Sequence, residues 1–320
     1  MIADPNAARP ATLDDVPGWF YTMDRHLFAW FLERQKRLGI SGDLIEMGTY
    51  MGRSAILLGD YLREGETFTV CDLFDSEAPD AASSGEMRMS YRSTLTREAF
   101  DTHYLAFHDR LPDIVQGPTS LLAEAGRITP KSVRFAHIDA SHLYEHVIGD
   151  IRVAREALAP DGVVVLDDYR SEHTPGVAAA VWEAVATMGL TPIVLSSSKL
   201  YATWGDPDAV QEELVQDSLA REGMKVTLEE IRGRRVLRLR ALPGMQPPPF
   251  RNSRFFDEVE AARVARAEEQ ARGKREQVRI EGARRAALAR LPSARARRIA
   301  RDLLPPIAAR AVRSVLRGKR

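Results

Sequence analysis

The chain has 320 residues, of which 44% are hydrophobic and 28% are charged, and these proportions are typical of a globular protein. Its single cysteine, Cys71, excludes an internal disulfide framework and fits a reducing compartment. No stretch approaches the roughly 20 apolar residues that a transmembrane helix needs, and the N-terminus lacks the pattern of a secretory signal. We therefore expect a cytoplasmic location.

The formal net charge of zero conceals an uneven distribution of charge. Residues 257–320 contain 18 Lys or Arg residues and 8 Asp or Glu residues, which gives this segment a net charge of +10 and leaves the rest of the chain at −10. An acidic body joined to a basic tail suggests that the two parts have different partners.

The first predicted element is an amphipathic helix at 24–38, and we assign residues 1–40 to an N-terminal helical lid. Short apolar runs then alternate with longer amphipathic segments. The runs predict buried strands at 43–47, 67–71, 133–138 and 163–166, and the segments between and after them predict helices at 53–62, 97–106, 143–158 and 176–188. This alternation predicts an α/β fold, a doubly wound Rossmann-like parallel sheet, in residues 41–242.

After this domain, segments 225–227 and 235–240 could add strands around a turn at Gly233. The proline-rich stretch 243–256 predicts a linker. We expect residues 257–320 to form an α-helical basic C-terminal extension or a partly disordered tail, and prolines in its last part predict a division into short segments.

The most informative segment follows the first predicted strand and opens the next helix. It contains Glu46, Gly48, Tyr50, Gly52 and Ser54. The two glycines allow a sharp turn that passes close to a ligand. A dinucleotide fingerprint would read G-x-G-x-x-G and hold a pyrophosphate, whereas here the spacing is G-x-x-x-G with an acid that would repel a phosphate. The motif therefore favours a ligand with an amino group and argues against an NAD-dependent oxidoreductase.

Acidic residues follow the other predicted strands. Asp72 ends the second strand, where a carboxylate can bind the hydroxyl pair of a ribose. Asp139 ends the third strand, and Asp167 and Asp168 end the fourth. Clustered carboxylates need a cation, a proton or basic partners, and hard oxygen ligands favour Mg²⁺, Ca²⁺ or Mn²⁺. The alternative is that these aspartates cap a helix or bind backbone.

Three motifs together resemble a known family. They are Glu46-x-Gly48-x-x-x-Gly52-x-Ser54, then Ile138-Asp139-x-x-His142-x-Tyr144, and then Pro160-Asp-Gly162 with Asp167-Asp168-Tyr169. The chain resembles the class I S-adenosyl-L-methionine (SAM)-dependent methyltransferases, and more narrowly the branch of the macrocin-type sugar O-methyltransferases. The resemblance spans about Gly18 to Trp204.

The resemblance implies roles for individual residues. It implies that Glu46, Gly48, Tyr50, Gly52 and Ser54 line the methionine end of SAM, with Asp72 on the ribose and Ser120 near the adenine. It also implies that Asp139, Asp167 and Asp168 hold Mg²⁺ or a similar divalent cation. The product would be a methylated hydroxyl of a sugar, a glycan or a small natural product.

The sequence departs from the family at the expected base. The position two after Asp139 is often a second aspartate in the family, but here it is Ser141, a poor base. We therefore expect His142 and Asp139 to be the catalytic residues, with His173 as the other candidate base.

The tail leaves several partners open. Basic residues alternate with apolar ones in 283–320, which is compatible with peripheral contact with an anionic membrane. The segment could equally bind the phosphates of nucleic acid, or fold back on the acidic body or on a second subunit of a homo-oligomer. A partly disordered, solvated extension is the further alternative. The acidic body argues against nucleic acid. The rival function is a methyltransferase-like binding module that the basic tail tethers to a membrane or to nucleic acid.

Overall fold

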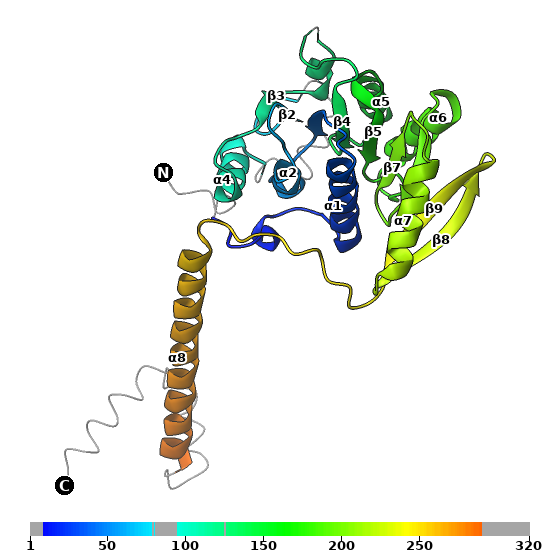
Figure 1. The fold of residues 1–320 in the computed structure, drawn as a ribbon. Coiled ribbons are helices and arrows are strands. Elements are labelled where there is room, and N and C mark those ends of the chain that lie inside the picture. Colours follow the sequence, from blue (N-terminus) through cyan, green and yellow to red (C-terminus); the bar gives the residue numbers. More distant parts are fainter. Residues whose placement is uncertain (1–8, 79, 81–94, 125, 290–320) are drawn as a thin grey trace, which may run out of the picture. The chain divides into compact units, whose positions relative to one another are not determined.

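The computed structural model describes residues 9–78, 80, 95–124 and 126–289. They include a mixed sheet of nine strands (Figure 1). The strands are β1 (Asp43–Met47), β2 (Phe68–Asp72), β3 (Asp113–Gln116), β4 (Val133–Ile138), β5 (Leu158–Leu166), β6 (Thr191–Leu195), β7 (Leu200–Thr203), β8 (Met224–Ile231) and β9 (Arg234–Ala241). Their order is β3-β2-β1-β4-β5-β7-β6-β9-β8. The predicted doubly wound α/β fold is confirmed.

Five neighbouring strands, from β3 to β5, are parallel, whereas β7 is antiparallel to both β5 and β6. Strand order reverses beside β1, because β2 lies on one side of β1 and β4 on the other. In such sheets ligands bind beyond the carboxyl ends of the strands at the point of reversal.

Helices cover both faces of the sheet. They are α1 (Thr22–Arg37), α2 (Arg53–Gly59), α4 (Arg97–Phe107), α5 (Tyr144–Ala157), α6 (Pro175–Thr187) and α7 (Asp208–Ala220). One apolar cluster joins α1, α2, α4 and α7 to the sheet, and the other joins α5 and α6 to it. Successive residues of β5 alternate between the clusters, Val163 and Val165 in the first and Val164 and Leu166 in the second, as a strand that is buried on both faces requires.

Helix α1 lies within the segment 1–40 that we assigned to a lid, and its apolar face packs against the sheet. The role of this segment as a lid stays a prediction. Leu27, Phe28 and Phe31 of α1 are buried. The Phe28 ring lies edge-on to Phe135 of β4 at 5.1 Å, and the Phe31 ring stacks on Tyr201 of β7 at 5.4 Å. This apolar face recurs every three or four residues, which places the helix against the sheet.

The predicted linker packs onto the same body. Buried Ser253 donates its backbone N–H to the carbonyl of Ala11 at 2.9 Å, and Arg254 donates its own to Ala106 at 2.9 Å. The chain divides into two compact units, Met1–Phe256 and Asp257–Arg320. The second unit is described only as far as helix α8 (Phe256–Ala289), so the most basic part of the tail, 290–320, lies outside the described residues.

Candidate active site

A cavity of about 640 Å³ lies at the carboxyl ends of the parallel strands. This volume is within the range of small-molecule sites. The cavity is lined by residues that follow β1, β2, β3, β4 and β5, together with others from the N-terminal segment and from α5. The lining includes these residues predicted from the sequence: Gly48, Tyr50, Ser54, Asp72, Ser120, Asp139, His142, Asp167 and Asp168. The structure thus brings most of the sequence-predicted site residues to one place. Glu46 and Gly52 are the two predicted cofactor residues that are absent from this lining.

The glycine turn after β1 closes tightly against the loop after β4. Gly48 has φ +80°, and a Cβ atom there would lie 2.2 Å from the carbonyl oxygen of Asp139. Gly52 has φ +90° and is the N-cap of helix α2, and its missing side chain leaves room for the Phe100 ring. Only glycine combines these backbone angles with such close neighbours. The turn therefore holds one wall of the cavity in a fixed shape.

Asp72 connects the second strand to this turn. Its Oδ2 accepts the backbone N–H groups of Thr49 at 2.7 Å and Tyr50 at 3.0 Å, and its Oδ1 accepts that of Phe74 at 2.9 Å. Burial raises the pKa of this carboxyl, although the three N–H groups act in the opposite direction. A carboxylate has about four acceptor sites, so Asp72 can still bind ligand hydroxyl groups from the cavity wall.

Glu46 lies behind the turn, fully buried in β1. Its Oε1 is 2.7 Å from Nδ1 of His137 on β4, the residue with which Glu46 is in register. No described group hydrogen-bonds its other oxygen, Oε2. An unsatisfied buried acceptor fits a ligand that brings an amino group, which is the property that the sequence suggested. The contact of Glu46 with a cofactor stays a prediction.

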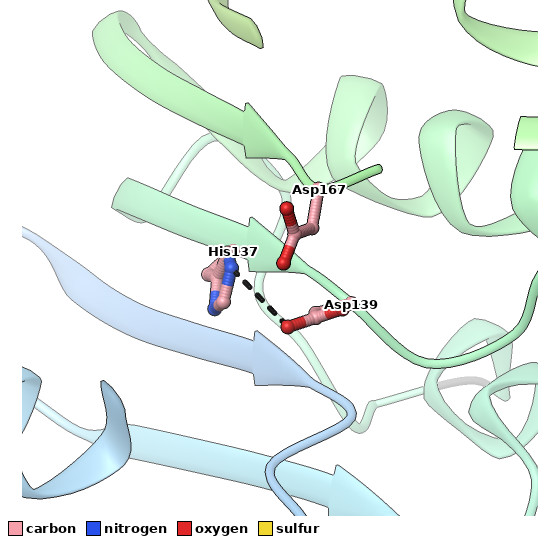
Figure 2. A group of neighbouring side chains, drawn as sticks. All are labelled: His137, Asp139 and Asp167. Carbon is pink, nitrogen blue, oxygen red and sulfur yellow. Dashed lines mark ion pairs between the residues drawn. The ribbon is translucent and has the colours of Figure 1, made fainter. Parts of the chain in front are cut away.

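Asp139 and Asp167 meet at the rim of the sheet because β4 and β5 are adjacent and parallel. Figure 2 shows both carboxylates beside His137, with 3.9 Å between His137 Nε2 and Asp139 Oδ2. Burial and the charge of Asp167 raise the pKa of Asp139 well above its ordinary value. Burial alone would also raise the pKa of Asp167, but the charge of Lys199 acts in the opposite direction and the pKa of Asp167 is lowered below its ordinary value. Lys199 thus favours the ionised form of Asp167.

Lys199 is a member of this charged cluster that the sequence did not predict. Its side chain is 1% exposed, and its Nζ contacts Asp167 Oδ2, lies 3.0 Å from His137 Nε2 and lies 3.8 Å from Asp139 Oδ2. Burial alone would lower the pKa of this ammonium, but Asp167, Asp139 and Asp24 together raise it. Burial and Lys199 lower the pKa of His137, which is therefore neutral, with Nδ1–H directed to Glu46 and Nε2 accepting from Lys199.

These residues do not fit the expected Mg²⁺ site. His137, Asp139 and Asp167 do offer ligand atoms within 4.8 Å of one another. However, the same three side chains surround the ammonium of Lys199, and one of them offers an imidazole nitrogen, whereas Mg²⁺ prefers oxygen. The requirement of clustered carboxylates for a cation is already met by Lys199.

Asp168, the third predicted metal ligand, faces other residues. Its backbone is left-handed, with φ +54°. Its Oδ1 accepts from Ser171 Oγ at 2.5 Å, and its Oδ2 lies 3.5 Å from Nε2 of His142. The rings of His142 and His173 are 5.9 Å apart, and both histidines line the cavity. The predicted base, His142, therefore has a carboxylate that can orient its ring.

Aromatic side chains border the entrance of the cavity. Trp19 and Tyr21 line it although their side chains are 63% and 54% exposed, and Phe20 beside them is buried. The Trp19 ring lies 5.4 Å from that of Tyr50 on the glycine turn. Exposed aromatic surface at a cavity provides apolar contact for an organic ligand.

Comparison with known protein families gives a match for part of the chain. Residues 45–169 match the family model described as a methyltransferase domain. No curated protein matches the chain.

Several solved structures are similar to the chain. The O-methyltransferase NovP is 20% identical, with 57% of this chain and 81% of that chain covered and a TM-score of 0.46. The calicheamicin methyltransferase CalS11 is 19% identical, with coverages of 58% and 82% and a TM-score of 0.43. An O-methyltransferase from Bacillus cereus in complex with SAH is 16% identical, with coverages of 56% and 80% and a TM-score of 0.34.

Proposed function

We propose that this chain transfers the methyl group of SAM to a hydroxyl oxygen of a sugar, a glycan or a small natural product. The match of residues 45–169 to a methyltransferase domain supports this proposal. One observation carries the proposal. A single cavity is bordered both by the glycine turn with Asp72 and by Asp139, His142 and Asp167. The glycine turn and Asp72 suit a nucleoside with an amino acid part. Asp139, His142 and Asp167 suit an acceptor group that must lose a proton.

The cofactor supplies a methyl group on a positively charged sulfur, so the protein has mainly to position the acceptor and remove its proton. The acceptor oxygen bonds to the methyl carbon while the carbon–sulfur bond breaks and S-adenosylhomocysteine (SAH) is left. His142 lines the cavity and is the residue that we assign to take the hydroxyl proton. Asp168, at 3.5 Å, orients the imidazole and stabilises its protonated form.

Asp139 lines the same cavity and can accept a hydrogen bond from the acceptor. The aromatic residues at the entrance, Trp19 and Tyr21, would cover the acceptor and exclude water. The predicted divalent metal finds no support in the donor set described above, and the mechanism therefore contains no step through a metal.

A direct test is incubation of the protein with SAM that carries a labelled methyl group, together with a panel of sugar nucleotides, glycans, catechols and alcohols. We expect label on a hydroxyl oxygen and an equal amount of SAH. Amine acceptors and nucleic acid belong in the same panel. Label on nitrogen or on nucleic acid would overturn the assignment to hydroxyl groups.

Contact of the tail with an anionic membrane surface stays a prediction, because residues 290–320 lie outside the described part. Helix α8 is a charged helix with ion pairs such as Arg279–Glu276 at 2.7 Å and Arg263–Glu260 at 2.6 Å. Among the described residues, no helix is both long and apolar enough to cross a membrane.

A further inference from the structure

A lysine ammonium occupies the place where the sequence predicted a metal ion. Lys199 belongs to the largest fully buried side chains of the described residues. Taking an ammonium out of water is costly, and a buried ammonium is tolerated only when it is paired. The contacts of Nζ with Asp167 and His137 provide that pairing.

The charges around Lys199 come from separate elements. Asp24 is contributed by α1, Asp139 follows β4 and Asp167 follows β5, and all three attract the ammonium. Asp24 is fully buried and accepts from Tyr201 Oη at 2.8 Å and from Ser198 Oγ at 3.2 Å. The ammonium of Lys199 thus stabilises carboxylates that would otherwise repel one another inside the protein.

The sheet fixes where the ammonium lies. Strand β7 runs antiparallel to β5, with Leu200 opposite Leu166, so the residues next to this pair, Lys199 and Asp167, also come together. The turn before β7 is closed by hydrogen bonds in which Ser196 N–H donates to the Lys199 carbonyl and Lys199 N–H donates to Ser196 Oγ, both at 2.9 Å. The pairing of β7 with β5 and the hydrogen bonds of this turn therefore fix the position of Lys199.

We propose that the ammonium of Lys199 takes the place of a divalent metal ion in this site, where it neutralises Asp167 and positions Asp139 at the cavity wall. Lys199 is a positioning residue, because it acts through the two aspartates and is not part of the cavity lining. If the proposed methyl transfer is correct, it then follows that this transfer needs no metal.

Binding of Mn²⁺, followed by electron paramagnetic resonance, tests this inference without knowledge of the acceptor. The full chain is titrated as wild type, as Lys199→Met and as the double variant Lys199→Met with Asp167→Asn. We expect no stoichiometric Mn²⁺ site in the wild type. In Lys199→Met we expect one site with an affinity at least about tenfold higher, because the carboxylates lose their internal cation, and the double variant should lose that site again.

Two results would overturn the inference. One is a stoichiometric Mn²⁺ site in the wild type that Asp167→Asn abolishes, and this measurement decides the matter even where Lys199→Met does not fold. The other is a folded Lys199→Met that binds no more Mn²⁺ than the wild type. Calorimetry with SAH on the same samples tests the proposed function separately, because the cofactor residues at the glycine turn are distinct from Lys199. Failure to bind SAH would count against the methyltransferase activity and leave the cation assignment intact.

Discussion

Lys199 and Asp167 form an ion pair across two strands of opposite direction, although 32 residues separate them in the chain. The Lys199 side chain is 1% exposed and that of Asp167 is 11% exposed. The pair connects the return strand β7 to the end of β5, which borders the cavity. Folding of the sheet and assembly of the site therefore depend on the same contact.

Removal of either partner of this pair should destabilise the protein. Lys199→Met leaves the carboxylates without their cation, and Asp167→Asn removes the strongest partner of the ammonium. We expect each single variant to lower the free energy of unfolding by about 3–5 kcal/mol. The double variant should lose less than the sum, because no uncompensated charge from this pair remains. Urea unfolding of the four proteins measures the coupling, and strict additivity would show that the two groups do not interact.

Gly48→Ala tests the fit of the glycine turn. The new Cβ would lie 2.2 Å from the Asp139 carbonyl oxygen, in a backbone with φ +80°. Gly39→Ala is the matched control, because Gly39 has φ +68° and no heavy atom within 4 Å of its Cβ position. We expect the control to cost about 1 kcal/mol and Gly48→Ala to cost about 3 kcal/mol or more. Equal thermal unfolding temperatures for the two variants would contradict the close approach of the two loops.

Asp150 should make stability dependent on pH. This residue lies on α5 and lines the cavity, and burial raises its pKa to about 7, although a hydrogen bond from Thr119 acts the other way. Its pKa in the unfolded chain is near the ordinary value of 3.8. Since the folded state binds the proton more tightly, stability is fully present below pH 4 and is lost as the pH rises toward 7.

The loss amounts to roughly 4 kcal/mol at most. Asp150→Asn removes this titration, so the unfolding free energy of the wild type relative to this variant should fall between pH 5 and pH 8. Denaturant unfolding at both pH values checks the difference. An identical pH dependence for the two proteins would mean that Asp150 is already ionised at pH 5.

His142→Gln should slow methyl transfer while cofactor binding remains unchanged. Loss of a general base typically costs 10²–10⁴-fold, so we expect kcat to fall by about a hundredfold or more. His173→Gln is the matched control, since His173 lines the same cavity with its ring 5.9 Å from that of His142. Steady-state rates at several pH values compare the two. A larger loss for His173→Gln would transfer the role of base to that residue.

Much of the fold could be predicted from the sequence, because local patterns determined it. Strands β1 and β4 have the predicted bounds, since apolar runs between polar turns leave little choice. Parallel neighbours bring their carboxyl ends to one edge, so the meeting of Asp139 with Asp167 also followed from the pattern.

Lys199 could not be predicted in the same way. In the sequence Lys199 follows three serines in a turn between two strands, and a lysine at such a position is ordinarily solvated. Lys199 is buried because β7 pairs in the antiparallel direction with β5. Asp24 did carry a signal, because it lies four residues before Phe28 and thus on the apolar face of α1. An acid on such a face indicates a buried partner, which here is Tyr201.

Calorimetric titration with SAH tests whether the cavity is the binding site of the methyl donor. We predict one binding site per chain in the wild type and at least about tenfold weaker binding in Asp72→Asn. The exposed neighbour Asp75 provides the control, and Asp75→Asn should bind as the wild type does. A folded wild-type protein that binds no SAH, or an Asp72→Asn variant that is folded and binds it undiminished, would contradict the proposed SAM site.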